Sequence, residues 1–179
     1  MKTTQILIAG FGGQGILFAG KFLAYKGLTE DKQVSWLPSY GPEMRGGTAN
    51  CNVILSETPI GSPIITQPDV LIAMNLPSLQ KYIDTVAPGG QVYVDSALIE
   101  VKVERTDVQV FYIPATQMAK DAGIASLANM IIVGSLLENN PELSFEGTEA
   151  VVEQLVPAKK AALVELNKKA LLLGKEYKG

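Results

Sequence analysis

A glycine-rich turn near the amino terminus carries the clearest chemical signal in the sequence. It consists of Gly10, Phe11, Gly12, Gly13, Gln14 and Gly15, which follow a short apolar run and match the pattern G-x-G-x-x-G. Glycines let a backbone turn sharply and approach a phosphate closely, and the free N–H groups of a following helix attract an anion. We therefore expect the turn to be an anion site, for example for a ligand of the coenzyme A type.

Two other interpretations of the turn stay open. The glycines could serve only a tight turn and close packing of a helix on a strand. A dinucleotide such as NAD or FAD would also need an acidic residue at the end of the second strand, where it binds the ribose hydroxyls. That strand ends in Trp36-Leu37-Pro38-Ser39, and Glu30 and Asp31 precede it. The sequence thus argues against a dinucleotide.

A second loop, after the second strand, combines an aromatic ring, a carboxylate and a guanidinium. These side chains belong to Tyr40, Glu43 and Arg45, and Gly46 and Gly47 follow them. Glycine and proline specify the backbone shape, while Tyr and Arg are residue types that anchor interfaces. We expect the loop to contact another subunit or to cover an active site. The alternative is a local pair of Glu43 and Arg45 at the surface, which contributes about 0–1 kcal/mol.

The composition excludes several kinds of chemistry. The chain has no histidine and a single cysteine, Cys51, so it cannot by itself form an imidazole triad, a disulfide or a four-thiolate cluster site. Cys51 lies in an alternating segment and is interpreted as a small buried residue. We predict no catalytic residue and no metal ligand in this chain. The net charge of −3 also argues against nucleic acid as a partner.

The elements that position the two loops can be predicted from hydrophobic periodicity. Residues 6–9 form a continuous apolar run that is typical of a buried strand, and a helix with Gly27 as its stop follows the glycines. Further strands are expected at 33–37, 49–55, 69–74, 91–95, 101–104 and 109–113, and helices after residues 74, 113 and 125. This alternation indicates an α/β fold with three layers, Rossmann-like or flavodoxin-like. Its sheet should be open and mostly parallel, with helices on both faces.

The length of 179 residues suits a single domain over 1–179, ending in an amphipathic helix at about 158–174. Asn129 interrupts an apolar helix and should brace a loop through a hydrogen bond. Glycines and Gln14 break the first apolar stretch, so it is a poor signal peptide, and no run is long enough for a membrane span. We expect a cytoplasmic location.

Three segments together resemble the gamma subunit of 2-oxoacid:ferredoxin oxidoreductases. They are residues 10–15, residues 40–47, and the strand from Asp69 to Asn75. The similarity continues through Asn129, Gly134 and the segment 167–170, and so covers nearly the whole chain.

The resemblance implies a complex that oxidatively decarboxylates a 2-oxoacid to its acyl-CoA and CO2 and passes electrons to ferredoxin. Its partners would be alpha, beta and ferredoxin-like subunits. These would hold thiamine diphosphate, magnesium and four-iron four-sulfur clusters, while the gamma subunit would hold neither the thiamine nor the clusters. Such a division of labour agrees with a chain that lacks histidine and has one cysteine.

The segment 44–51 looks more like the 2-oxoglutarate and branched-chain branches of the family than like the pyruvate branch, and we favour 2-oxoglutarate. Two other classes of function stay open. One is a free-standing dinucleotide-binding redox protein, and the other is a pure assembly scaffold whose glycine turn binds nothing.

Overall fold

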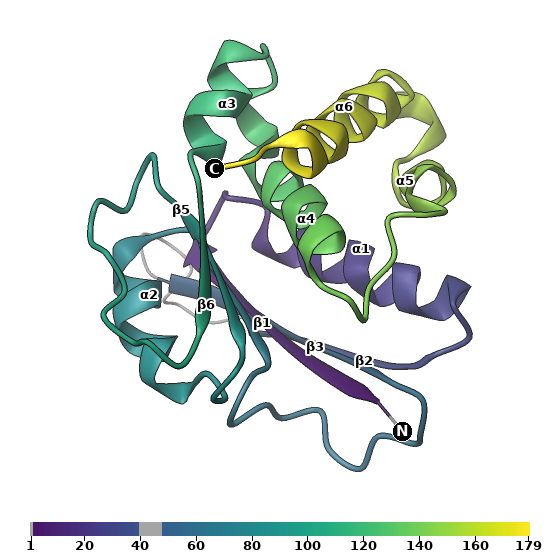
Figure 1. The fold of residues 1–179 in the computed structure, drawn as a ribbon. Helices are drawn as coiled ribbons and strands as arrows, with labels where there is room; N and C mark the ends of the chain where they lie inside the picture. The colour runs from purple at the N-terminus through teal and green to yellow at the C-terminus, as the bar shows by residue number, and fades with distance from the viewer. Residues whose placement is uncertain (1, 40–47) are drawn as a thin grey trace.

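The computed structural model describes residues 2–39 and 48–179 of the chain. These described residues form six strands and six α-helices (Figure 1). The strands are β1 (Thr3–Phe11), β2 (Gln33–Ser39), β3 (Thr48–Ser56), β4 (Val70–Ala73), β5 (Gln91–Asp95) and β6 (Gln109–Ile113). The helices are α1 (Ile16–Thr29), α2 (Leu76–Tyr82), α3 (Ala115–Asp121), α4 (Ala128–Asn139), α5 (Thr148–Leu155) and α6 (Ala162–Glu176).

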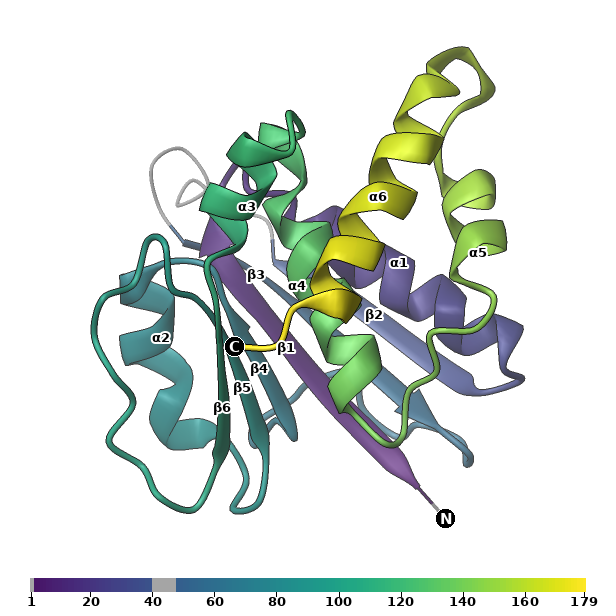
Figure 2. The same cartoon turned by 45° about the horizontal axis from the view of Figure 1, so that its top comes forward.

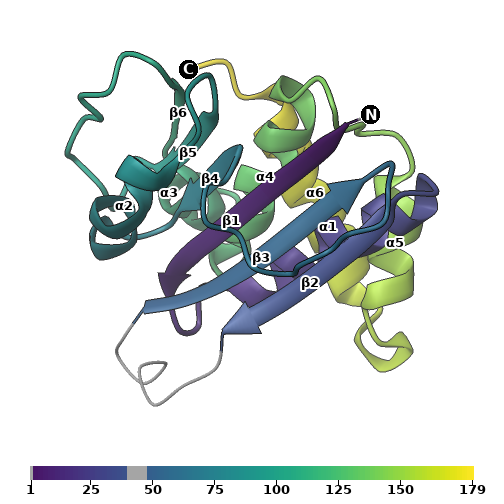
Figure 3. The same ribbon diagram turned by 90° about the horizontal axis from the view of Figure 1, so that it is seen from below.

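The strands form one open sheet in the order β2-β3-β1-β4-β5-β6. β1, β4, β5 and β6 are parallel to one another, whereas β3 runs antiparallel to both β1 and β2. β3 therefore lies between two strands that point the same way, as the view from below shows (Figure 3). The sheet is mixed but mostly parallel, which confirms the predicted α/β class.

Helices cover the two faces of the sheet unequally. α1, α3, α4, α5 and α6 lie on one face, while α2 lies on the other (Figure 2). The side chains of β1 alternate between the two resulting cores, with Ile6 and Ile8 in the larger one and Leu7 in the smaller one. The three layers agree with the predicted architecture. In the described part of the chain, no helix is long and apolar enough to cross a membrane.

Several elements differ from the sequence-based expectations. Residues 101–104 form no strand, although Val103 packs against the smaller core. α1 continues through Gly27 to Thr29, so Gly27 does not end the helix. A Cβ on Gly27 would collide with the side chain of Leu55, and the glycine therefore serves close packing. The helix α5 was not predicted, since its eight residues give too short a periodic pattern. A short 3₁₀ turn at Ala158–Lys160 precedes α6.

Two glycines allow α4 and α6 to pack backbone against backbone. A Cβ atom on Gly174 would collide with the carbonyl oxygen of Ile131, and one on Gly134 would collide with the carbonyl oxygen of Leu171. Each helix thus places a glycine against a carbonyl of the other. Neither position tolerates a side chain without a shift of backbone, so this crossing fixes where the C-terminal helix sits on the domain.

Candidate functional site

The glycine turn lies at the carboxyl edge of the sheet, between β1 and α1. From this edge α1 crosses to one face, and α2, which follows the neighbouring strand β4, crosses to the other. The gap between β1 and β4 is therefore the topological switch point of the sheet, the place where open α/β proteins bind ligands. The glycine turn singled out from the sequence thus lies at the edge of the sheet where ligands bind in open α/β folds.

The glycines of the turn have different structural roles. Gly13 and Gly15 have φ angles of 91° and 73°, in the left-handed region that side chains rarely adopt. Gly10 and Gly15 also pack tightly, because a Cβ on Gly10 would lie 3.0 Å from the Cβ of Met74 and one on Gly15 would meet the side chain of Asn129. A Cβ on Gly13 would meet nothing within 4 Å, and Gly12 is exposed. Close packing thus explains Gly10 and Gly15 but leaves Gly12 and Gly13 free to face a ligand.

Gln14 ties the turn to the neighbouring strand. Its Oε1 accepts a hydrogen bond from the backbone N–H of Phe11 at 2.6 Å, and its Nε2 donates to the carbonyl oxygen of Met74 at 3.0 Å. The side chain therefore bridges the ends of β1 and β4 at the switch point. It acts as a brace for the turn, because both ends of its amide are engaged by backbone groups.

Asn129 holds the other side of the turn. Its Nδ2 donates to the carbonyl oxygen of Gly15 at 2.9 Å, and the side chain is buried at the start of α4. This contact confirms the expectation that a polar residue on an apolar helix braces a loop. Gly15 itself is the N-cap of α1 and supplies no side chain to its first turn. The N-terminus of α1 therefore keeps N–H groups and positive partial charge available for an anion.

Two polar residues at the same edge escaped the sequence analysis. Asn75 follows β4 and caps α2, since its Oδ1 accepts from the N–H of Ser78 at 2.8 Å. Its Nδ2 is buried and has no hydrogen-bond partner among residues 2–39 and 48–179. Asp95 ends β5, is fully buried, and accepts from the hydroxyl of Thr116 at 2.5 Å and from the N–H of Ala97 at 3.2 Å. A polar residue directly after an apolar run was the available signal for both.

The second candidate loop, with Tyr40, Glu43, Arg45, Gly46 and Gly47, lies outside the described residues. The strands on either side of it are described. Thr48, the first residue of β3, pairs with Phe11 at the end of β1. The segment that follows the loop therefore starts beside the glycine turn, at the carboxyl edge of the sheet.

Cys51 is buried in β3 and faces the larger core. Burial raises the pKa of its thiol to about 12. The contact with the indole of Trp36 lowers this pKa, but by less than burial raises it. A thiol with so high a pKa is a poor nucleophile at neutral pH. Among residues 2–39 and 48–179, no three His, Cys, Asp or Glu side chains gather in a way that could hold a metal ion.

The fold and the turn define a doubly wound α/β protein in which an antiparallel strand separates β1 from β2. This insertion moves the end of β2 away from the glycine turn, so a ribose-binding acid could not stand where dinucleotide-binding folds need it. The sequence profile described as "Pyruvate ferredoxin/flavodoxin oxidoreductase" matches residues 5–177. The chain belongs to this family, and within it to the gamma-subunit type of keto/oxoacid ferredoxin oxidoreductases.

Solved structures support the assignment. The gamma subunit of a keto/oxoacid ferredoxin oxidoreductase from Geobacter sulfurreducens is 33% identical, with a TM-score of 0.85 over 98% of this chain and 96% of that one. The 2-oxoglutarate:ferredoxin oxidoreductase from Magnetococcus marinus, solved with 2-oxoglutarate, coenzyme A and succinyl-CoA bound, is 25% identical with a TM-score of 0.86. This similarity covers 98% of our chain and 31% of the other.

Two similar proteins are named for different substrates. The ketoisovalerate oxidoreductase subunit VorA of Methanothermobacter thermautotrophicus is 38% identical over 177 residues, and the chain spans only 36% of its length. The 2-oxoglutarate synthase subunit KorC of Methanothermobacter marburgensis is 36% identical over 160 residues, with 86% of both chains covered.

Proposed function

We propose that this chain is the gamma subunit of a complex that oxidatively decarboxylates a 2-oxoacid to its acyl-CoA and CO2, with ferredoxin as the electron acceptor. Its partners are alpha, beta and ferredoxin-like subunits. Similarity over nearly the whole chain to proteins named for this chemistry supports the proposal. Among substrates we favour 2-oxoglutarate, since the KorC subunits match this chain over most of their own length, with a branched-chain 2-oxoacid as the alternative.

The redox cofactors belong to the partner subunits in this proposal. The iron–sulfur clusters need several thiolate ligands, which this chain does not offer, because its one thiol is buried. Thiamine diphosphate and its magnesium ion are assigned to the alpha and beta subunits by the resemblance to the family. When bound, the thiamine supplies the carbanion chemistry of decarboxylation and the clusters carry the electrons. The gamma chain contributes binding and positioning.

That contribution is an anion site for coenzyme A at the glycine turn. The observation that carries it is the combination of an α1 N-terminus without a side-chain cap and the open space beside Gly13. Helix N–H groups and a close-approaching backbone suit a phosphate. The related Magnetococcus marinus enzyme was solved with coenzyme A bound. We propose further that the loop with Tyr40, Glu43, Arg45, Gly46 and Gly47 contacts a partner subunit or covers the active site.

A pair of matched variants tests the anion site in the reconstituted complex. Gly13→Ala and Gly123→Ala both force a side chain onto a residue with positive φ, at 91° and 73°, and in both cases the added Cβ meets nothing within 4 Å. The backbone strain is therefore similar, about 1–2 kcal/mol. Only Gly13→Ala should raise the KM for CoA, with the KM for the 2-oxoacid little changed.

The outcomes separate the alternatives. If Gly13→Ala and Gly123→Ala leave the same CoA dependence in correctly assembled complexes, the turn is a packing element and the chain acts as a scaffold. Saturable binding of NAD to the purified chain, without any effect of CoA, would favour a free-standing dinucleotide-binding protein. Both results contradict the proposed role of the turn.

A further inference from the structure

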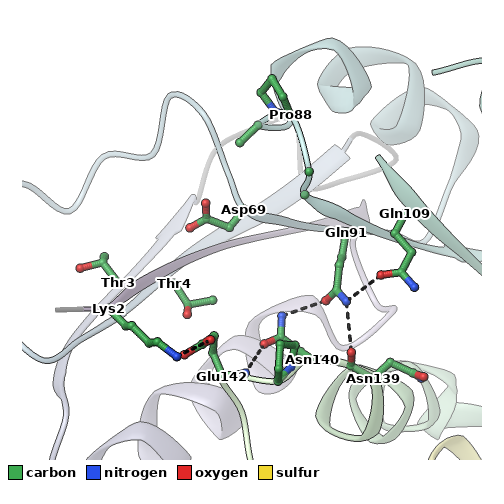
Figure 4. Close-up of a pocket in the computed structure, with 14 residues that line it drawn as sticks. Lys2, Thr3, Thr4, Asp69, Pro88, Gln91, Gln109, Asn139, Asn140 and Glu142 are labelled. Carbon is green, nitrogen blue, oxygen red and sulfur yellow. Dashed lines mark hydrogen bonds and ion pairs between the residues drawn. The ribbon is translucent and has the colours of Figure 1, made fainter. Parts of the chain in front are cut away.

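A cavity of about 580 Å³ opens at the amino edge of the sheet, the edge opposite the glycine turn (Figure 4). Its floor is made by Thr3 and Thr4 at the start of β1 and by the first residues of β5 and β6. The turn at residues 87–90 closes one side, and residues 139–142, which follow α4, form the opposite wall. Nothing in the proposed function uses this cavity.

Carboxamides make one wall of the cavity rigid. The Oε1 of Gln91 accepts hydrogen bonds from Asn140 Nδ2 at 2.8 Å and from the hydroxyl of Tyr93 at 3.2 Å. Its Nε2 donates to the backbone oxygen of Asn139 at 3.1 Å and to Gln109 Oε1 at 3.3 Å. Figure 4 shows the contacts of Gln91 with Gln109, Asn139 and Asn140 beside the cavity. The wall is thus preformed, because the buried Gln91 has its hydrogen-bonding groups satisfied within the protein.

The charged residues around the cavity leave one carboxylate without a cation. Lys2 and Glu142 form an ion pair at 2.9 Å and neutralise each other. Asp69 uses Oδ2 to accept the backbone N–H of Gln5 at 2.8 Å, and among the described residues it has no ion pair. The carboxyl end of α4 adds negative partial charge on the same side. The cavity is therefore electrostatically suited to a positive group.

Thr4 places a second polar group at the cavity. The residue is only 7% exposed and lines the cavity, and no hydrogen bond between described residues engages its hydroxyl. The hydroxyl oxygen is therefore free to accept a hydrogen bond from a group in the cavity. A group that donates several hydrogen bonds could satisfy both Thr4 and the free oxygen of Asp69.

We infer that this cavity binds an organic cation through a primary ammonium or guanidinium group, with Asp69 as its counter-ion and Thr4 as a further acceptor. The cavity falls in the size range of small-molecule sites. A bare metal ion fits less well, because among the described lining residues one carboxylate, that of Asp69, has no ion pair. The cation could be a free amine or the side chain of a Lys or Arg on a partner protein. This inference does not depend on the proposed function.

The test uses the full chain and defined probes, followed by two-dimensional NMR of the backbone amides. Agmatine carries both an ammonium and a guanidinium group, 1-pentanol is a neutral control, and an end-blocked Gly-Arg-Gly peptide presents the guanidinium as a protein would. We expect agmatine to shift the amide signals of Thr4, Asp69 and Gly90 in a saturable way, and 1-pentanol to leave them unchanged.

A matched pair of variants then assigns the counter-ion. Asp69→Asn removes the charge but keeps an oxygen for the N–H of Gln5, so its fold should be retained. Asp121→Asn removes an exposed charge on α3, far from the cavity lining. Charge-assisted hydrogen bonds are roughly twice as strong as neutral ones, so Asp69→Asn should weaken agmatine binding about tenfold or more. Asp121→Asn should leave it unchanged.

Each outcome is decisive. Binding of agmatine but not of the peptide identifies a free amine as the occupant, and binding of the peptide identifies a partner's side chain. No saturable shift in the wild-type chain up to about 10 mM agmatine overturns the inference, whatever the variants do. So does binding that is equally strong in wild type and Asp69→Asn.

Discussion

Replacement of Gly174 by alanine should destabilise the chain, although alanine is the better helix former. Outside a crowded contact the exchange would stabilise a helix by about 1 kcal/mol. Here the new Cβ would overlap the carbonyl oxygen of Ile131 and lie 2.8 Å from its carbonyl carbon and 2.9 Å from the N of Ser135. Because all three neighbours are backbone atoms, α4 and α6 must move apart.

The size of the effect follows from these opposing terms. Overpacking of this kind costs about 1–3 kcal/mol, and we take the upper value because the obstacle is backbone rather than a flexible side chain. After the gain in helix propensity, the net loss is about 2 kcal/mol. For a domain of this length, this corresponds to a fall in Tm of about 4–8 °C. Circular dichroism measures it, and the fluorescence of Trp36, the only tryptophan, gives an independent record.

Gly61→Ala is the matched control. Gly61 has an ordinary φ, and a Cβ there meets nothing within 4 Å, so its Tm should stay close to that of the wild type. Gly134→Ala should behave like Gly174→Ala, and the double variant should lose less than the sum, since one separation of the helices relieves both overlaps. A Tm for Gly174→Ala at or above the wild-type value would refute the reasoning.

Two further outcomes are expected. Cys51 should resist alkylation by iodoacetamide at pH 8 in the native chain and react in urea, since a rise in its pKa from 9.0 to about 12 lowers the thiolate fraction roughly a thousandfold. Mass spectrometry follows the modification. Rapid labelling of the native chain would contradict the buried placement of the thiol. Arg45→Ala should melt like wild type as a free chain but assemble with partner subunits at least about thirtyfold more weakly. Removal of an arginine buried at an interface leaves its charged partner unpaired, which costs about 2–5 kcal/mol of association. Wild-type assembly and turnover of this variant would favour the alternative, a local surface pair of Glu43 and Arg45.

The sequence predicts the parallel part of the fold well and its exceptions poorly. Short apolar runs such as residues 6–9 indicate buried strands regardless of context, and the glycine turn has a local pattern. The direction of β3 has no local signal, because alternation reveals unequal faces but not the neighbours of a strand. By intrinsic propensity, Gly134 and Gly174 weaken the helices that contain them. Their role in the close backbone contact of α4 and α6 follows only from the crossing of these helices, which the sequence does not reveal.

The candidate sites divide in the same way. Gly10 to Gly15 could be found from spacing, since all of the residues are contiguous. Asn75 and Asp95 join them only through the order of β1, β4 and β5 in the sheet. The cavity at the amino edge collects residues that are up to about 140 positions apart, such as Lys2 and Glu142. No periodicity in a single sequence reports contacts of that kind.

The insertion of β3 between β1 and β2 also divides the sheet into parts of unequal resistance to local opening. Within the described sheet, β2 pairs with β3 alone, so a fluctuation that separates β3 from β1 separates β2 from β1 as well. β1, β4, β5 and β6 keep their parallel pairing through such an event. Amide protons of β2 should therefore exchange with solvent through the opening of a two-strand unit, while those of β1 and β4 follow deeper unfolding. The half of the sheet that carries both ends of the segment 40–47 is thus joined to the parallel half through one strand pair, β1 with β3.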